Sequence, residues 1–498
     1  MNHLSAAKYL TAALILVAML KAWLLWQLPL TGDEAYFIVW GQQLEWGYYD
    51  HPPAVGWLLF VMSHLWDNLY FYRSFAYFGS MLLAWVLYRW LRLEGFNAEK
   101  SLLVALIFWL SPVSLIFVLT TNDTVLVVTG VLGLYLFARA LQSNHLGYGF
   151  AAGVFLGLAF LSKYFAAFML IGVLLFVVVY RQQVPWRVVI VTASVVLLAV
   201  AENLYFNYHN CWNNILFNFF SRTRESELQF GTLLEFLAML VLMLTPWALW
   251  MWGRYRESTL KQGFALSRDG ALSPLWLYAT LPLFAILLLA SLSNPVGLHW
   301  GLLGLSVLSG LLVLMQKNAL RHLLKWHLLF AVTALVVVNV SLVFLPHFLS
   351  SNQVQKAAPY LQPQSLCAQL PMGEWFTLDY SSQSMLSYHC QNNDIHVFAS
   401  QSKYGREDDK RINFAEYDGK TLHILLLKPS RLERIQPYFA QVSIQPLAPV
   451  MGVSYQWVRA EGFDYAAYQQ DVLNPVRQKF YTPPDWLQKI LPNAQCQM

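Results

Sequence analysis

Charged residues are scarce in this sequence. Asp, Glu, Lys and Arg together make up 12% of its 498 residues, about half the share that is usual in soluble globular proteins. So little charge cannot cover a surface that faces water on all sides. Hydrophobic residues make up 57% and aromatic residues 16% of the chain. This composition indicates a polytopic membrane protein.

Motifs for nucleotide and metal chemistry are also missing. The sequence has neither a Walker-type glycine loop nor a G-x-G-x-x-G turn, the signatures of two common phosphate-binding loops. It has four cysteines, no Cys/His cluster at zinc spacing and no H-E-x-x-H, which are the usual signs of zinc sites. No cofactor is therefore certain. A divalent metal stays an open alternative, with Asp50 and His209 as candidate ligands.

Long apolar runs recur from the N-terminus to about Leu345. Each has roughly 18–22 residues, the length needed to cross about 30 Å of hydrocarbon. We predict an all-α membrane domain with about eleven transmembrane helices, at roughly residues 8–29, 72–91, 101–119, 123–141, 148–162, 164–180, 187–206, 231–250, 273–292, 297–315 and 326–345. The first run is too long for a cleaved signal peptide, and no small-residue cleavage site precedes Asp33.

The distribution of positive charge predicts the orientation. Lys and Arg concentrate in alternate loops, at residues 89–100, 139, 181–187, 254–268 and 317–325. By the positive-inside rule these loops are cytoplasmic. The net charge of +5 thus orients the chain and does not suggest nucleic acid. We expect an integral membrane protein with a cytoplasmic N-terminus, and an odd number of spans then places everything after residue 346 outside, which is the periplasm if the membrane is a bacterial inner membrane.

The sequence changes character after residue 345. Polar residues become frequent, and short β-like runs at 396–400 and 422–428 alternate with polar segments. These features predict two domains: a transmembrane catalytic domain at 1–345 and a small soluble α/β domain at 346–498. Cys367 and Cys390 lie in the tail, where they either form a disulfide in an oxidising space or stay as two buried thiols.

On this topology the sparse polar residues of the membrane part gather at its external face. The first external loop holds Asp33, Glu34, Tyr49, Asp50 and His51. The other members of the group are Asp123, Lys163, His209, Arg222, Arg224 and His299. Each has an ordinary alternative role. Asp123 could cap a helix, Lys163 could extend to the membrane interface, and the arginines could bind lipid headgroups. Ionisable residues at a membrane boundary are nonetheless candidates for function.

The chemistry of these residues suits glycosyl transfer from a lipid-phosphate sugar. A carboxylate can take a proton from an acceptor hydroxyl. Lys, Arg and His can hold a phosphate, above all when it gains charge on leaving. Aromatic faces such as that of Tyr49 suit sugar rings and isoprenoid chains.

The segment GDEAYFIVWGQQLEWGYYDHPPAVGWL resembles the signature of bacterial glycosyltransferase family 39. This family includes relatives of the protein O-mannosyltransferases and the aminoarabinose transferases of lipid A, and its members have the GT-C fold and use polyprenyl-phosphate sugars. Weaker resemblance lies in SPVSLIFVLTTNDTVLVV, GLAFLSKYFA, NYHNCW, FNFFSRTRE and LHWG, and SKYGREDDKRINF is similar to the soluble domain of the same bacterial branch.

The resemblance implies roles for single residues. Asp33 takes the place of the first-loop catalytic acid, Glu34 is its neighbour in acceptor or fold support, and Asp123 matches the second acid. Lys163, Arg222 and Arg224 would contact the lipid phosphate. The chain departs from the family pattern at three positions, where Asn122 replaces a usual proline, His51 a frequent lysine and His299 a usual asparagine.

The sequence therefore predicts an integral-membrane glycosyltransferase. It would move a sugar from a polyprenyl-phosphate donor to a cell-envelope acceptor at the extracytoplasmic face. A glycolipid such as lipid A is the favoured acceptor, before a polysaccharide or a protein. The alternatives are a protein O-glycosyltransferase of the same family and a transporter or flippase for polyprenyl lipids. A transporter usually places polar residues near the midplane in two related halves, and no second copy of the Asp33–Glu34 segment is present.

Overall fold

The computed structural model describes residues 3–221, 228–256 and 273–490. The chain divides into two compact units. Unit 1 comprises residues 1–27, 66–202 and 226–342, and unit 2 comprises residues 28–65, 203–225 and 343–498. Unit 2 thus joins the first predicted external loop and the residues after the seventh predicted span to the tail, a grouping that the sequence pattern did not indicate.

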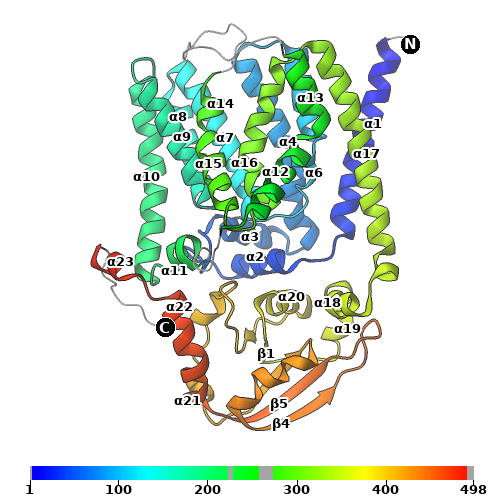
Figure 1. Cartoon of the computed structure of the whole chain (residues 1–498), viewed down its shortest axis with the longest axis vertical. Helices are drawn as coiled ribbons and strands as arrows, with labels where there is room; N and C mark the ends of the chain where they lie inside the picture. The colour runs from blue at the N-terminus through cyan, green and yellow to red at the C-terminus, as the bar shows by residue number, and fades with distance from the viewer. Residues whose placement is uncertain (1–2, 222–227, 257–272, 491–498) are drawn as a thin grey trace. The chain divides into compact units, whose positions relative to one another are not determined.

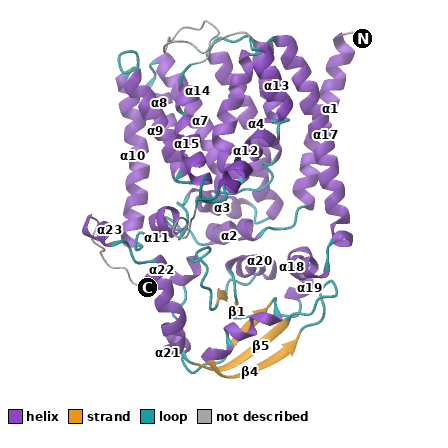
Figure 2. Ribbon diagram, in the orientation of Figure 1, coloured by secondary structure: helices purple, strands orange, loops and turns teal. Residues whose placement is uncertain are grey.

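Unit 1 is built from helices (Figures 1 and 2). The longer ones are α1 (His3–Gln27), α4 (Leu69–Leu93), α5 (Ala98–Trp109), α7 (Asn122–Ser143), α8 (Leu146–Phe160), α9 (Phe165–Val179), α10 (Trp186–His209), α12 (Phe230–Leu244), α13 (Pro246–Tyr255), α15 (Leu281–Ser291) and α17 (Lys317–Phe348). Between them lie the short helices α6 (Pro112–Leu115), α14 (Leu275–Tyr278) and α16 (Leu302–Leu308), with 3₁₀ turns at Leu298–Gly301 and Ser309–Leu314.

Helix α7 is the most enclosed of the long apolar helices. In its most apolar window 83% of the residues are buried, against 17% in α1, α10 and α17. A Cβ at Gly133 would lie 2.9 Å from the side chain of Leu156 on α8. Only glycine therefore allows these two helices to approach so closely, as small residues commonly do in membrane helix pairs.

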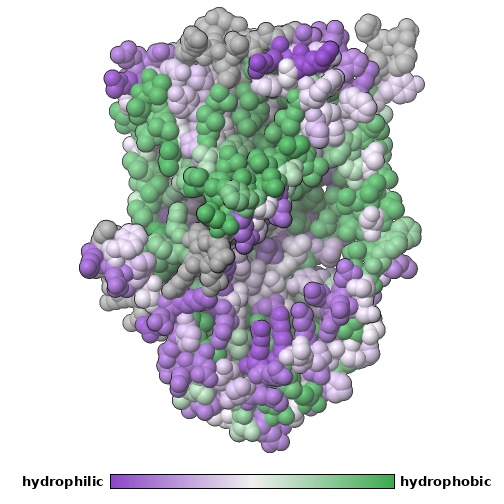
Figure 3. All heavy atoms as spheres, in the orientation of Figure 1, coloured by the Kyte–Doolittle hydropathy of each residue, from purple (hydrophilic) through white to green (hydrophobic). Residues whose placement is uncertain are grey.

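Helices α1 and α17 lie side by side and are joined by buried amides (Figure 1). Asn339 donates to the carbonyl of Leu20 at 3.1 Å and accepts from Gln27 at 2.8 Å. Such bonds between apolar helices add to packing where no hydrophobic force draws helices together. The face of unit 1 that Figure 3 shows is broadly hydrophobic, and the exposed apolar residues of this unit include Leu197, Leu198 and Val340. A surface of this kind suits lipid better than water.

Helical residues occupy each of the eleven predicted spans. Among the described residues, four helices are long and apolar enough to cross a membrane, namely α1, α7, α10 and α17. The bent pair α12 and α13, at 70°, makes a fifth if it is one span. Several other predicted spans hold apolar helices of 10–17 residues or broken helices. The chain therefore has spans of the predicted kind, while the count of about eleven stays a prediction.

Unit 2 begins with the first loop, which folds into α2 (Gly32–Gln42) and α3 (Ala54–Leu65). The end of α10 leads into α11 (Asn213–Leu216) and a π-turn at Phe217–Ser221. The tail contributes helices α18 (Ser351–Leu361), α19 (Pro363–Cys367), α20 (Tyr380–Cys390), α21 (Tyr465–Tyr468), α22 (Asn474–Phe480) and α23 (Asp485–Ile490). Its strands are β1 (Trp375–Thr377), β2 (Ile395–Val397), β3 (Leu422–Leu426), β4 (Phe439–Pro446) and β5 (Gln456–Phe463).

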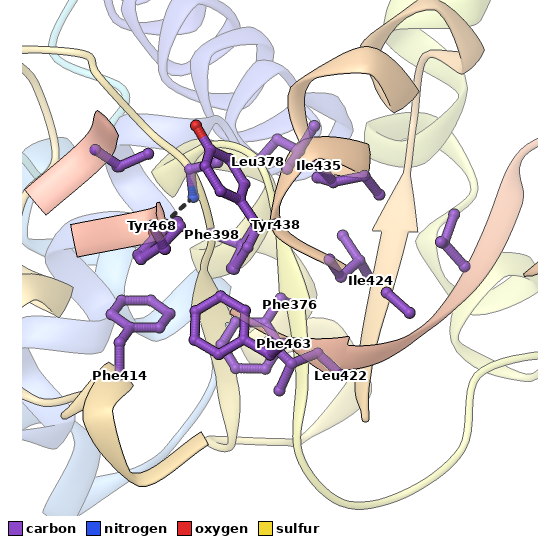
Figure 4. Packing of buried hydrophobic residues seen from close by; sticks show 14 of the residues in the cluster. Phe376, Leu378, Phe398, Phe414, Leu422, Ile424, Ile435, Tyr438, Phe463 and Tyr468 are labelled. Atoms are coloured by element: carbon purple, nitrogen blue, oxygen red, sulfur yellow. Dashed lines mark hydrogen bonds between the residues drawn. The ribbon is translucent and has the colours of Figure 1, made fainter. Parts of the chain in front are cut away.

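The tail sheet has the order β2-β1-β3-β5-β4. β1 is parallel to β2 and to β3, whereas β3–β5 and β5–β4 are antiparallel. The β-like runs at 396–400 and 422–428 overlap β2 and β3. One sheet face covers a core of aromatic residues (Figure 4), in which the rings of Phe398 and Tyr468 stack at 4.7 Å.

A disulfide joins Cys367 to Cys390, with Cα atoms 5.2 Å apart. It links the end of α19 to the end of α20 and thereby fixes the helix that follows β1. Of the two alternatives left open by the sequence, the bridge is the one present. Cys211, near the end of α10, is disulfide-bonded as well.

Candidate active site

Asp33 and Glu34 lie in the first turn of α2, where their side chains have different surroundings. Thr31 caps the helix by accepting from the backbone N–H of Glu34 at 3.3 Å. Asp33 is exposed, whereas Glu34 is 1% exposed. Adjacent helix residues point about 100° apart, and in α2 this rotation leaves Asp33 facing solvent and Glu34 facing the interior. Asp33 is therefore the acid that an incoming hydroxyl can reach.

The Asp33 carboxylate has a partner in the tail that the sequence did not indicate. The hydroxyl of Tyr380, at the start of α20, donates to Asp33 at 2.9 Å. Burial raises the pKa of Tyr380, and the negative charge of Asp33 raises it further. Tyr380 therefore remains a protonated donor. Helices α2 and α20 approach so closely that a Cβ added at Gly32 would lie 2.6 Å from the Cβ of Ser381. Glycine at position 32 therefore permits this approach.

The 48–51 loop is buried within unit 2. Tyr48 stacks on Trp40 at 4.3 Å and donates to the carbonyl of Trp40 at 2.8 Å. Tyr49 is fully buried and has Phe217 and Tyr481 as ring neighbours at 5.5 Å. The buried side chains of these two tyrosines thus fix the conformation of the loop. Contact between Tyr49 and substrate stays a prediction.

The two polar residues that follow Tyr49 are buried as well. Asp50 and His51 are 7% and 8% exposed. The Asp50 carbonyl accepts from Asn218 at 2.8 Å, and the His51 ring lies against Phe37, Trp40 and Phe217. The loop is therefore held by α2 and by the residues that follow α11.

The tail segment around Glu407 also holds this loop. The carboxylate of Glu407 accepts from the backbone N–H of Tyr49, and its own N–H donates to the hydroxyl of Tyr36 at 3.4 Å. Burial raises the pKa of Tyr36 well above its ordinary value, and the carboxylates of Asp50 and Glu407 add to the rise. The signal for this contact was present in the run of charges REDDKR (406–411), but nothing in the sequence said what it would contact.

Asp123, Lys163 and His299 come together in unit 1. Asp123 lies in the first turn of α7, whose N-cap is Thr121, and Lys163 lies at the break between α8 and α9. The Lys163 ammonium donates to both carboxylate oxygens of Asp123 at 2.8 Å. His299 Nε2 lies 3.7 Å from Asp123.

This cluster joins a buried ion pair to an exposed ring. Asp123 and Lys163 are 6% and 4% exposed, while the His299 side chain is 53% exposed. The ammonium of Lys163 also faces the rings of Phe165 and Trp300 at 5.3 and 5.8 Å. An ammonium held among aromatic faces is a fixed positive charge, and its anionic partner orients it.

Three predicted site residues remain outside these contacts. His209 is exposed at the end of α10 and lies between the rings of Tyr205 and Tyr208. Arg222 and Arg224 lie outside the described residues. Within the described part of the chain, no group of three or more His, Cys, Asp or Glu is placed to hold a metal. Asp50 and His209 therefore belong to no such group among those residues.

Known proteins with a similar sequence or fold point to one superfamily. Residues 50–206 match the family described as dolichyl-phosphate-mannose-protein mannosyltransferase. The chain is 26% identical over 184 residues to the lipid A galacturonosyltransferase RgtD of Rhizobium johnstonii, which covers 35% of this chain and 38% of that protein. The match thus spans about two fifths of the relative's length.

The fold gives a longer match. ArnT from Cupriavidus metallidurans, in its structure bound to undecaprenyl phosphate, aligns with a TM-score of 0.65, covering 92% of this chain and 98% of ArnT at 14% identity. The apo structure of the same protein aligns with a TM-score of 0.64. The resemblance to GT-C glycosyltransferases is confirmed. At this identity the likeness to ArnT is one of fold.

The family match covers only part of the candidate site. The matched region of 50–206 contains Asp123 and Lys163, which form the buried pair. It leaves out Asp33 and the whole tail, and the contacts of Tyr380 and Glu407 are known here only from the structure. Sequence reasoning missed both because a contact across more than 300 residues leaves no local pattern.

Proposed function

We propose that this chain is an integral-membrane glycosyltransferase that moves a sugar from a polyprenyl-phosphate donor to a cell-envelope acceptor. The observation that carries the proposal is the split of the acidic pair on α2, where Asp33 alone is exposed and has a hydroxyl donor beside it. The GT-C resemblance supports the reaction class. The names of the similar proteins support a lipid-linked donor and favour a glycolipid such as lipid A as acceptor.

Asp33 is the general base in this proposal. The acceptor hydroxyl oxygen would form a bond to the anomeric carbon of the sugar while its proton passes to the Asp33 carboxylate. The bond from that carbon to the phosphate oxygen would break, and its electron pair would leave with the polyprenyl phosphate. Tyr380 would keep Asp33 aimed through its hydrogen bond, which makes it a positioning residue. Buried Glu34 would support the helix.

Lys163 supplies positive charge for the departing phosphate. Charge-assisted bonds from an ammonium strengthen as the phosphate gains charge. Asp123 would act through Lys163 by fixing its ammonium, and exposed His299 would offer a second contact. Arg222 and Arg224 remain proposed phosphate ligands. We place residues 31–70, 207–230 and 350–498 on the extracytoplasmic side, and a cytoplasmic C-terminus in reporter fusions would contradict this orientation.

The direct test is an assay with purified protein, polyprenyl-phosphate sugars and envelope extracts, read by mass spectrometry. A glycolipid fraction that gains one sugar mass would support the favoured acceptor. A modified protein fraction would instead support the protein O-glycosyltransferase alternative. Transport of the donor across vesicles without a transferred sugar would contradict the enzymatic proposal.

A further inference from the structure

The tail of unit 2 has a cavity of about 590 Å³ that the proposed transfer reaction does not use. Its walls come mainly from the segments that follow three parallel strands. Leu378 and Asp379 follow β1, Ser400 and Ser402 follow β2, and the turn after β3 supplies Arg431 and Arg434. The volume lies within the range of about 300–1,000 Å³ that is usual for small-molecule sites.

The strand order explains why the cavity lies there. The chain enters the sheet at β1, passes through α20 to β2 on one side, and then forms β3 on the other side of β1. Thr377 pairs with Val397 and Phe376 with Ile424, so all three strands end at one edge. Open sheets that reverse direction in this way bind ligands outside the carboxyl ends of their strands, at the point of reversal.

The charges around the cavity are unequal. Arg431 donates to Asp379 at 3.1 Å, and Asp379 also caps α20 by accepting from the N–H of Ser382 at 2.9 Å. Because Asp379 caps the N-terminus of α20, that terminus is not free to bind an anionic ligand. Arg434 is exposed and has no hydrogen-bond or ion-pair partner among the described residues. Two arginines against one aspartate leave the lining with one positive charge in excess.

The loop after β2 is held in a fixed shape and presents polar groups. Arg406 is buried and donates to the carbonyls of Ser400 and Ser402, both at 2.9 Å. The Oγ of Ser400 accepts from the N–H of Ser402 at 3.4 Å, and that of Ser402 accepts from the N–H of Tyr404 at 3.1 Å. Both hydroxyl protons are then left to donate, because a hydroxyl both accepts and donates.

A second contact secures the start of that loop. Ala399 has a left-handed φ of 51°, and its N–H donates to the hydroxyl of Tyr468 at 3.0 Å (Figure 4). Leu378 and Tyr438 belong both to the aromatic core and to the cavity wall. The polar groups therefore stand on a rigid base, which lowers the ordering cost of binding.

We propose that this cavity binds an acidic saccharide. The phosphate or carboxylate of the ligand contacts the guanidinium of Arg434, which suits both groups. The ring hydroxyls contact Ser400, Ser402 and Gln401, which also lines the cavity. A glycolipid headgroup and a soluble sugar phosphate share this chemistry. The site is separate from the transfer reaction and needs neither Asp33 nor Lys163.

The test is calorimetry on the full-length protein in detergent, with glucose 6-phosphate, glucose and inorganic phosphate as probes. Glucose 6-phosphate should bind, and Arg434→Gln should weaken it by roughly tenfold to a hundredfold. The affinity of Arg434→Lys for glucose 6-phosphate should lie between those of the parent protein and Arg434→Gln. The matched control is Arg459→Gln, because Arg459 is a half-exposed arginine on β5 that does not line the cavity. The affinity of this variant for glucose 6-phosphate should stay at the parent value.

Two further measurements define the ligand. Ser402→Ala should weaken glucose 6-phosphate and leave inorganic phosphate unchanged. Vesicles containing phosphorylated lipid A should displace glucose 6-phosphate if the natural ligand is a headgroup, and failure to displace it would assign the site to a soluble sugar phosphate. Binding that is unaffected by Arg434→Gln, or equal for inorganic phosphate and glucose 6-phosphate, would overturn the proposal. These readouts need no transfer activity, so they stand if the proposed reaction fails.

Discussion

The backbone N–H of Tyr49 donates to the carboxylate of Glu407, which lies 358 residues further along the chain. Both groups are buried in unit 2. Glu407→Ala would leave the Tyr49 N–H without this acceptor, at a cost of about 1–3 kcal/mol in unfolding free energy. Glu407→Gln keeps an acceptor oxygen and should cost less. Thermal unfolding in detergent measures both.

The control for this prediction is Glu416→Ala. Glu416 is an exposed tail glutamate whose carboxylate accepts from Asn413 at 3.0 Å. Surface changes of this type usually stay within about 0.5 kcal/mol. Equal destabilisation by Glu407→Ala and Glu416→Ala would mean that the contact with Tyr49 contributes nothing.

Asp33→Asn should abolish most turnover while donor binding survives. An amide cannot accept the proton, and general-base assistance typically contributes about 10²–10⁴-fold. Tyr380→Phe removes only the hydrogen bond to Asp33 and should lower kcat less, and with little change in donor KM. Single-turnover assays separate these effects. Asp394→Asn, at an exposed acid of the tail, is the control, and near-parent turnover in a folded Asp33→Asn enzyme would remove Asp33 from the mechanism.

The pair of Asp123 and Lys163 should show strong coupling. Removing one partner leaves a buried charge, so Lys163→Met or Asp123→Asn alone should cost about 3–5 kcal/mol of stability. The double variant should recover part of that loss. Use of the lipid donor should fall in both variants that lack Lys163.

The exposed pair of Arg321 and Glu99 is the comparison for that cycle. Arg321→Met should change stability much less than Lys163→Met, because solvent screens exposed pairs. Additive effects of the two substitutions at Asp123 and Lys163 would show that the two do not act as a unit.

The sequence predicted apolar helices where the structure has them, because apolar runs are local features. The count of spans and the catalytic roles of the acids stay predictions. It also predicted strands that overlap β2 and β3. It did not predict that Asp33 and Glu34 differ in exposure, since that depends on α20 packing against α2. Lys163 was expected to face phosphate, yet both oxygens of Asp123 engage it, a contact set by the packing of α7 against α8. The contacts of the tail with Tyr49 and Asp33 could be identified only from the folded structure.

The disulfide between Cys367 and Cys390 should stabilise the tail. The bridge closes a segment of 23 residues, and loops of this length typically contribute about 2–4 kcal/mol. The double variant Cys367→Ser/Cys390→Ser should unfold at a lower temperature. Mass spectrometry of non-reduced peptides should show the linked pair, and finding both thiols free would contradict the structure.

The stability of unit 2 should depend on pH through His396. Burial alone lowers the pKa of His396, but the hydrogen bond to Asp408 at 3.2 Å and the charges of Asp408 and Glu374 outweigh it, and the net pKa is raised above 6.5. The stabilisation is therefore complete below pH 6.5 and is lost as pH rises through the folded-state pKa. Melting temperatures of the parent and His396→Gln should converge as pH increases.

His423 on β3 offers a control of opposite sign. Burial lowers its pKa, and the charge of Arg459 lowers it further. Below pH 6.5 His423 is protonated in the unfolded chain but stays neutral longer in the folded one, so protonation favours unfolding. The melting temperature of His423→Gln should therefore rise relative to that of the parent as pH falls. If the melting temperatures of His396→Gln and His423→Gln changed with pH in the same direction relative to the parent, neither histidine would be the cause of the pH dependence.

Unit 2 is completed by residues that are made long after its first loop. Synthesis proceeds at roughly 5–20 residues per second, so roughly 20–70 s separate Tyr49 from Glu407, which follows it by 358 residues. During that interval α2 and the 48–51 loop lack Tyr380, Glu407 and Tyr481. The first loop is thus made well before the tail residues that complete its native contacts.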